Sequence, residues 1–271
     1  MIFNTFLFLV TMLHPPGVIR HGIDKQLSLD LARQPEFECV GMMTQNFRIK
    51  GSCVLIHPRM ALTAAHTLIK LVEGEPLILE FDSLRIKVDS FRIHPWYTSN
   101  KGADLAVLYL SEPIKNIPVA ALNTSRKEIG RIGTSVGFGN FSVANNPRDI
   151  TDAGRVKSAG QNMLDSIEGI RLPDRQVPFL YADFDSPDSP ALNRSGTTEC
   201  LPLEYGLDGG DSGGGMFIQG KKKKLLAGIN ALQKKNIGDL MRTGTFYGSA
   251  SEWVRISVFR KWIKRKMKEL K

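Results

Sequence analysis

Short apolar runs separated by turn residues recur along most of this chain, and they limit the folds it can adopt. Residues 53–56, 77–81 and 105–110 are such runs, and residues 84–88 alternate apolar with charged side chains, the period-2 pattern of a half-buried strand. The 25 glycines and 14 prolines supply many turns. Only the segment after residue 255 has apolar residues at helical spacing. These patterns predict an all-β protein with one C-terminal α-helix, rather than alternating strands and helices.

The net positive charge comes from two short segments and is not spread over the whole protein. The 271 residues carry a formal net charge of +9. Residues 255–271 hold eight Lys or Arg and one Glu, and Lys221–Lys224 add four positive charges, so the rest of the chain is slightly negative. A nearly neutral main body predicts no nucleic-acid partner. The basic segments are expected to be solvated, or to attract an anionic surface such as lipid head groups.

The first residues have the character of an export signal. Residues 1–13 are uncharged and include the apolar run 6–10, which Pro-Pro-Gly at 15–17 interrupts. Such a run is too short to span a membrane and fits the core of a signal peptide, although no Lys or Arg precedes it. We therefore expect residues 1–17 to be a signal peptide and the protein to be secreted or periplasmic. A misannotated start or a disordered N-terminus is the alternative.

The chain has three cysteines, Cys39, Cys53 and Cys200, which are too few for a disulfide scaffold. No cluster of Cys and His has the spacing of a zinc site, so neither a metal nor a cofactor is expected. A hairpin centred near Asn46 would place Cys39 directly opposite Cys53. The two would then form a disulfide or remain as two core thiols in contact.

The segment from Gly209 to Gly215 is the most specific in the sequence, because it places Ser212 among glycines. Glycines leave a serine hydroxyl exposed and free backbone N–H groups beside it, as a nucleophile and its oxyanion require. A phosphate-binding loop is the alternative, but such a loop has Lys before its Ser or Thr, where this chain has Asp211. We therefore interpret Ser212 as a nucleophile.

Chain order excludes one class of serine hydrolase. Gly210-x-Ser212-x-Gly214 also matches the nucleophile elbow of α/β-hydrolases, in which the histidine base follows the serine. The histidines of this chain are at positions 14, 21, 57, 66 and 94, and none follows Ser212. The base must therefore come from upstream.

His66 and Asp104 are the best upstream partners for Ser212. His66 follows an apolar run and has small neighbours, which leave its ring accessible. Asp104 opens the apolar run 105–110, where an unpaired carboxylate would be costly. An imidazole N–H would satisfy that carboxylate, and the pair would fix the histidine tautomer.

The three segments Thr63-Ala64-Ala65-His66, Asp104-Leu105-Ala106-Val107-Leu108 and Gly210-Asp211-Ser212-Gly213-Gly214 follow one another in the order His, Asp, Ser. In this order and spacing the chain resembles the trypsin/chymotrypsin-like serine protease family. Further matches are Gly51-Ser52-x-Val54-Leu55-Ile56, Ile93-His94-Pro95-x-Tyr97, Val136-Gly137-Phe138-Gly139 and Val254-Arg255-Ile256-Ser257. Ala182-Asp183-Phe184-Asp185 and Leu203-Glu204-Tyr205-Gly206 are most similar to secreted bacterial or fungal members.

The resemblance implies two packed six-stranded antiparallel β-barrels, with the site in the cleft between them. The expected domain covers residues 37–271, with barrels at 37–125 and 126–254 and a helix at 255–271, after an N-terminal extension or propeptide-like segment at 18–36. His66 and Asp104 would come from the first barrel and Ser212 from the second. The backbone N–H groups of Gly210 and Ser212 would bind the oxyanion.

The resemblance also implies where the chain departs from its family. Gly206 falls at the base of the primary substrate pocket, with Ala231 and Gln233 on its wall. An uncharged residue at the bottom of the pocket predicts a preference for apolar or small side chains before the scissile bond, rather than Lys or Arg. The family pairs a new N-terminus with the aspartate before the serine. Asp211 is present for that role, but the usual Ile-Val-Gly-Gly start is missing.

Two functions remain open at this stage. The first is a serine endopeptidase that cleaves protein or peptide substrates through an acyl-enzyme. The second is a non-catalytic binding protein on a protease scaffold, attracted to anionic surfaces by its basic tail. In either case the tail helix is expected to pack against the second barrel, with Trp262 as its anchor. A helix lying on a membrane surface is the alternative.

Overall fold

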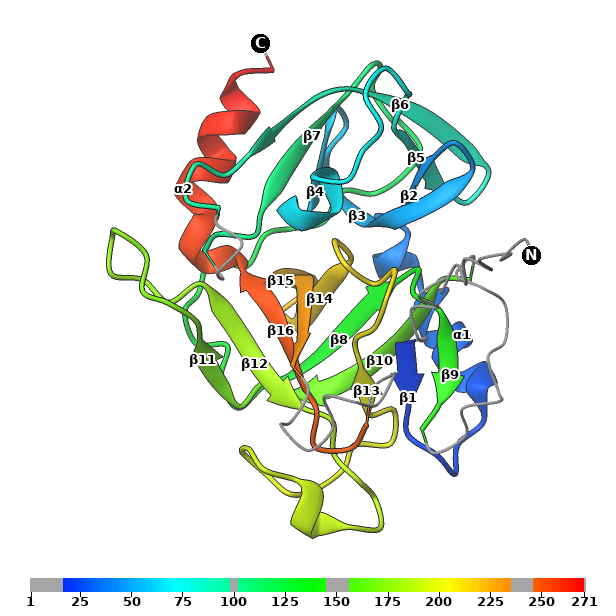
Figure 1. Cartoon of the computed structure of the whole chain (residues 1–271), viewed down its shortest axis with the longest axis vertical. Coiled ribbons are helices and arrows are strands. Elements are labelled where there is room, and N and C mark those ends of the chain that lie inside the picture. Colours follow the sequence, from blue (N-terminus) through cyan, green and yellow to red (C-terminus); the bar gives the residue numbers. More distant parts are fainter. Residues whose placement is uncertain (1–16, 98–101, 145–155, 235–245, 271) are drawn as a thin grey trace, which may run out of the picture.

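The computed structural model describes residues 17–97, 102–144, 156–234 and 246–270 of the chain (Figure 1). Its first half is a closed barrel in which each strand is antiparallel to its neighbours, in the order β2-β3-β4-β7-β6-β5. The strands are β2 (Val40–Gln45), β3 (Arg48–His57), β4 (Met60–Thr63), β5 (Ile78–Phe81), β6 (Leu84–Ile93) and β7 (Ala106–Leu110). The predicted alternation is confirmed for residues 85–88, where Ile86 and Val88 are buried and Arg85 and Lys87 are exposed, whereas Leu84 at the start of the strand is 38% exposed.

The second half is a curved antiparallel sheet of seven strands in the order β10-β8-β14-β15-β16-β12-β11. The strands are β8 (Ile132–Gly137), β10 (Ser158–Met163), β11 (Ser166–Glu168), β12 (Phe179–Asp183), β14 (Gly215–Gln219), β15 (Lys224–Lys234) and β16 (Ala250–Arg255). The predicted two-barrel, all-β fold is therefore confirmed. Its second half differs from the expected six-stranded barrel, because it has a seventh strand and its two edge strands do not pair with each other.

A third, small sheet attaches the start of the described chain to the second half. Strand β1 (Gly17–Ile19) lies between β13 (Tyr205–Gly206), to which it is antiparallel, and β9 (Phe141–Val143), to which it is parallel. Val18 and Ile19 are buried there. Helix α1 (Lys25–Ala32) follows and packs on β10, where Ser28 hydrogen-bonds with the backbone of Ala159. Short 3₁₀ turns cover Pro35–Phe37, Ala65–Leu68 and Pro190–Leu192.

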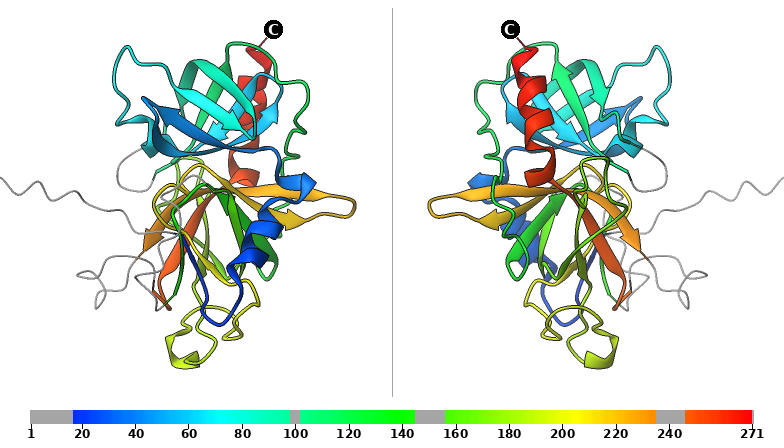
Figure 2. Two further views of the ribbon diagram at one scale, coloured as in Figure 1. Left: turned by 90° about the vertical axis from the view of Figure 1, so that its right-hand side faces the viewer. Right: turned by 90° about the vertical axis from the view of Figure 1, so that its left-hand side faces the viewer.

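The C-terminal helix α2 (Ile256–Lys268) crosses from the second half to the first, as two views of the molecule show (Figures 1 and 2). Phe259 and Trp262 are buried, and their rings lie 5.0 and 4.7 Å from the ring of His94, just after β6. The helix contacts β15 of the second half, so the expected packing is confirmed in part. Its residues Phe259 and Trp262 also lie against His94 of the first barrel, a contact that the sequence did not predict. No helix of the described residues has the length and apolarity needed to cross a membrane.

The hairpin formed by β2 and β3 does not bring its two cysteines opposite each other. A bulge after Met43 shifts the register, so Cys53 pairs with Gly41 and the carbonyl of Cys39 accepts a hydrogen bond from Leu55. Both thiols are free and buried. Burial raises the pKa of Cys39 to about 12. Two inert core thiols, rather than a disulfide, are what this register produces.

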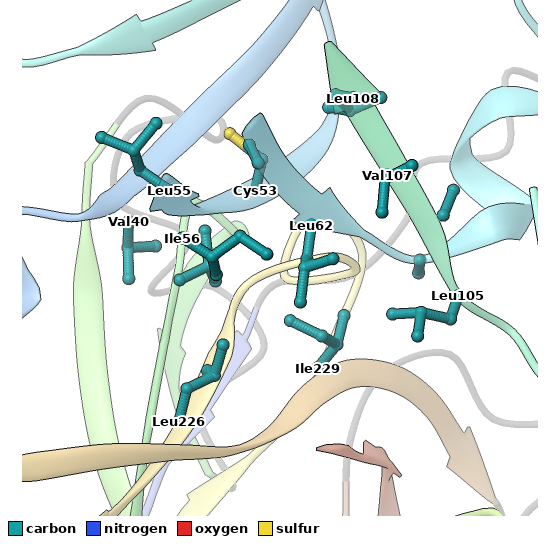
Figure 3. Close-up of a cluster of buried hydrophobic side chains, with 14 of the residues drawn as sticks. Val40, Cys53, Leu55, Ile56, Leu62, Leu105, Val107, Leu108, Leu226 and Ile229 are labelled. Atoms are coloured by element: carbon teal, nitrogen blue, oxygen red, sulfur yellow. The ribbon is translucent and has the colours of Figure 1, made fainter. Parts of the chain in front are cut away.

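One apolar core runs across both halves and fixes how they meet. Figure 3 shows Leu55 and Leu62 of the first barrel near Leu226 and Ile229 of β15, and all four are buried in one continuous cluster. Because protein interiors pack densely, side chains at this junction keep the two halves in register. The loops that leave the two halves at the junction are therefore held close together.

Candidate active site

His66 and Asp104 meet because of strand pairing in the first barrel. Strands β4 and β7 pair with Thr63 opposite Ala106, so the residues just after β4 and just before β7 emerge at the same end. The His66 backbone N–H donates to Asp104 Oδ1 at 2.9 Å, and His66 Nδ1 lies 2.7 Å from Asp104 Oδ2. The Asp104 side chain is only 6% exposed, so its carboxylate is held in one orientation. This contact fixes the ring of His66, leaving Nε2 to face outward.

Ser212 faces that free nitrogen from the second half. Its Oγ lies 2.9 Å from His66 Nε2. The first barrel holds the serine segment directly, because the Ser52 N–H donates to the Ser212 carbonyl at 2.7 Å and the Ser52 hydroxyl donates to the Gly210 carbonyl at 2.9 Å. The structure thus brings together the three side chains that the sequence singled out.

Glycine is required where the serine segment touches the first barrel. Gly213 has φ of +91°, and a Cβ there would collide with the carbonyl oxygen of Ser52. On the facing strand, a Cβ at Gly51 would lie 2.6 Å from the carbonyl oxygen of Ser212. Close backbone approach therefore explains why glycines stand on both sides of this contact.

The backbone around Ser212 leaves two donors free. From residue 208 to residue 214, each backbone N–H donates to a neighbouring oxygen within the protein, apart from those of Gly210 and Ser212. No hydrogen bond among the described residues uses these two groups. Two unpaired N–H groups flanking a serine hydroxyl can stabilise a negatively charged oxygen that develops there.

Asp211 lies beneath the serine and is completely buried. Its carboxylate accepts hydrogen bonds from the N–H of Gly139, the N–H of Asp208 and the hydroxyl of Tyr205. Burial raises its pKa from 3.8 to about 6, and the three donors oppose that rise. Gly137 and Gly139 leave room for the carboxylate, since a Cβ at either position would lie within 2.6 Å of it.

A cavity of about 210 Å³ opens beside His66 and Ser212. Its lining comprises His66, Leu207, Asp208, Gly209, Ser212, Ala231, Leu232 and Gln233. Ala231 and Gln233 thus lie where the sequence predicted a pocket wall. Gly206 is buried in β13 and pairs with Val18, so its neighbours Leu207 and Asp208 face the cavity instead. Among the described residues, no group of three or more His, Cys, Asp or Glu could hold a metal ion.

Sequence reasoning missed two residues that shape the site. Ser52 and Tyr205 both appeared only as parts of family-like segments, without a role. Ser52 bridges the two halves by donating to Gly210 and accepting from the N–H of Phe138. Neither contact has a local sequence signal, because each partner is more than 80 residues away.

Comparisons with known proteins agree with this architecture. The family model described as Trypsin matches residues 33–177, a span that includes His66 and Asp104 and ends before Ser212. A sequence search of curated proteins finds no match. Among solved structures, the chain is similar to neuropsin, a serine protease expressed in the limbic system of mouse brain, with a TM-score of 0.59 and 16% identity. The alignment covers 86% of this chain and 96% of neuropsin, and at this identity the likeness concerns the fold.

Proposed function

Because the chain belongs to the trypsin family, whose model matches more than half of it, we propose that it is an active serine endopeptidase. The observation that carries the proposal is the line of contacts from Asp104 through His66 to Ser212, at 2.7 and 2.9 Å. A serine becomes a nucleophile when a base within hydrogen-bond reach accepts its proton, and when a third group orients that base. Protein and peptide substrates follow from the family.

The mechanism assigns one role to each side chain. Ser212 Oγ attacks the scissile carbonyl carbon while His66 Nε2 takes the hydroxyl proton. Asp104 holds the Nδ1–H tautomer and stabilises the imidazolium ion. His66 then gives the proton to the leaving amine, and an acyl-enzyme remains on Ser212. A water molecule, activated by the same histidine, attacks the ester and restores the enzyme.

The free N–H groups of Gly210 and Ser212 are proposed to bind the oxyanion of each tetrahedral intermediate. Donors that are already oriented need no rearrangement when the charge develops, and losing one such donor costs about 10²–10³ in kcat in a serine protease. The hydrogen bonds that occupy the neighbouring N–H groups support this assignment, because they fix the loop backbone that presents the two free donors.

We propose that the cavity accepts the substrate side chain that precedes the scissile bond, with a preference for small or apolar residues. Leu207 and Ala231 supply apolar surface, and Gln233 also lines the cavity. A buried Lys or Arg needs a counter-ion. Among the described residues of the lining, Asp208 is the one carboxylate, so a strong preference for Lys or Arg in a peptide-library cleavage profile would indicate that Asp208 binds the substrate cation.

A fluorophosphonate probe tests the activity directly, because it reacts with an activated serine. We expect labelling of the wild-type chain and of Ser111→Ala, which removes an exposed serine at the opposite end of β7 from Asp104. We expect no labelling of Ser212→Ala. A folded wild type that stays unlabelled would favour the second candidate, a binding protein on this scaffold. The exposed basic side chains Lys261, Lys264 and Arg265 of α2 are the observation behind that candidate.

We also propose that the protein is exported, on the strength of its uncharged start. The expected signal peptide falls almost entirely on residues 1–16, which lie outside the described part of the chain. Gly17, its last expected residue, begins β1, so cleavage before Gly17 would keep that strand intact. The likeness of residues 182–185 and 203–206 to secreted bacterial or fungal proteases supports the same proposal. N-terminal sequencing of the protein recovered outside the cytoplasm would test it.

A further inference from the structure

We infer that Tyr205 is a positioning residue whose hydroxyl holds the carboxylate of Asp211, so that the Ser212 segment is ordered without an ammonium group at the chain's N-terminus. The inference rests on the proposed protease function. It assigns the activation of this site to a side chain of the second half, rather than to a cleavage that creates a new terminus.

The carboxylate of Asp211 is already supplied with donors from its own half of the molecule. Oδ1 accepts from the Gly139 N–H at 3.0 Å, and Oδ2 accepts from the Tyr205 hydroxyl at 3.0 Å and the Asp208 N–H at 3.1 Å. Each carboxylate oxygen offers two lone pairs, and a buried carboxylate with three donors is largely satisfied. No ion pair among the described residues includes Asp211.

The three donors to Asp211 are all neutral groups. Burial raises the pKa of Asp211 to about 6, and the three hydrogen bonds oppose that rise. Burial and the nearby Asp211 raise the pKa of Tyr205 well above 10, so its hydroxyl keeps the donated proton throughout the neutral range.

Tyr205 is held firmly enough to act as a fixed donor. It is completely buried, and its backbone belongs to β13, where it pairs with Ile19 of β1. Its ring packs against Gly160 of β10, where a Cβ would lie 2.7 Å from two ring carbons. The Ser158 hydroxyl lies 3.3 Å from the tyrosine oxygen. Strand pairing on one side and ring packing on the other therefore aim the hydroxyl at Asp211.

The position of Asp211 connects this contact to catalysis. It lies between Gly210 and Ser212, whose N–H groups are the free donors proposed for the oxyanion. Because its side chain is anchored below, the backbone on either side has little freedom to rotate. Loss of the tyrosine hydroxyl should therefore impair the transition state more than substrate binding.

The first experiment asks whether a new N-terminus is needed. The full chain, carrying an uncleaved N-terminal affinity tag, is treated with a fluorophosphonate probe, and the labelled species are identified by intact mass. We expect labelling of the untrimmed chain at a rate within about twofold of any trimmed form. Labelling that is confined to trimmed chains would overturn the inference while preserving the proposed protease. Absence of labelling in every form would overturn the protease itself.

The second experiment compares two tyrosines. Tyr205→Phe removes the hydroxyl on Asp211, and the matched control Tyr247→Phe removes a buried hydroxyl that contacts His21. We expect Tyr205→Phe to lower kcat at least tenfold with KM changed less than threefold, and the control to keep kcat within twofold. Equal effects of the two changes would overturn the inference. If Tyr205→Phe does not fold, the labelling of the untrimmed wild type still tests whether the site is ordered without a new N-terminus.

Discussion

The two halves of the molecule bury different kinds of side chain. Among the described residues, the closed barrel has Asp104 as its one buried carboxylate, and that group contacts His66. From residue 128 onward the buried carboxylates are Glu128, Asp183, Asp185, Glu204, Asp211 and Glu252. The core of the first half is therefore largely free of carboxylates, and its one buried carboxylate orients a histidine. The second half buries six carboxylates among its described residues, so it should respond to pH and to polar substitutions as the first does not.

The largest effect is expected from the first half's own catalytic group. His66→Ala removes the base that accepts the serine proton, and in triad enzymes such a loss lowers kcat by about a millionfold. Stability should fall by about 1–3 kcal/mol, because the buried Asp104 keeps its hydrogen bond from the His66 N–H but loses the ring nitrogen. Turnover of a fluorogenic peptide and a thermal melt measure the two effects. His57→Ala, in the same barrel, is the control and should keep full activity; undiminished turnover of His66→Ala would refute the role of the base.

Trp262→Ala tests whether the closed barrel needs the end of the chain. Its side chain is 6% exposed and lies on His94, so removing it should lower the free energy of unfolding by about 3–5 kcal/mol. Urea denaturation would measure the change. The neighbouring exposed Lys261→Ala should stay within about 0.5 kcal/mol of wild type. If Trp262→Ala lowers the free energy of unfolding by less than about 1 kcal/mol, the contact of the helix with the first barrel contributes little to stability.

The ion pair of Glu128 with Arg255 tests the dependence of the second half on paired charge. The two side chains are 0% and 7% exposed and meet at 2.8 Å. Glu128→Gln leaves the guanidinium buried without its counter-ion, which should cost about 3 kcal/mol.

Two further variants sharpen this result. Glu128→Gln combined with Arg255→Met should recover part of the loss, because no unpaired charge remains. Glu269→Gln, which breaks the exposed pair with Lys266, should have no measurable effect on the melting temperature. A loss as large at Glu269 as at Glu128 would contradict the contrast between buried and exposed pairs.

The effect expected from Asp185 depends on pH. Burial, and then Asp183 and Asp165, raise its pKa to about 8. Unfolded chains ionise the same group near pH 4. Between these values the folded protein binds a proton that the unfolded chain has released, so stability falls as pH rises through this window. Asp185→Asn removes that titration.

Relative to wild type, the free energy of unfolding of Asp185→Asn should therefore rise by about 3–4 kcal/mol from pH 5 to pH 8. The melting temperature should rise with it, by about 2–4 °C for each kcal/mol in a protein of this size. Asp89→Asn, on an exposed position of the closed barrel, serves as control and should show no such trend. A pH-independent difference at Asp185 would contradict the predicted protonation.

Local patterns predicted much of the fold. The period-2 alternation of residues 84–88 and the hairpin around Lys221–Lys224 lie where they were expected, in β6 and between β14 and β15. Chain order and the small residues around His66 and Ser212 also selected the side chains that the structure brings into contact. Their catalytic roles remain predictions. Each of these inferences used neighbours in sequence, or a family-like spacing.

The sequence did not predict which residues far apart along the chain contact one another. Helical spacing defined the apolar stripe of α2, but an amphipathic stripe does not specify which surface covers it. The β2–β3 register failed for a smaller reason, since one bulge after Met43 displaced Cys39 from Cys53. Tyr205 carried no signal at all, because a tyrosine hydroxyl has a partner only once the chain has folded around Asp211.

The crossing of α2 onto the first barrel has a consequence for how the protein is made. Strands β2 to β7 are complete in sequence at Leu110, yet Phe259 and Trp262, which cover His94, are translated only after all the strands of the second half. At about 5–20 residues per second, the ribosome needs roughly 8–30 s to produce the intervening chain. During that interval the nascent first barrel carries an uncovered aromatic surface. Aggregation can therefore compete with folding until the final turns of the helix emerge and dock.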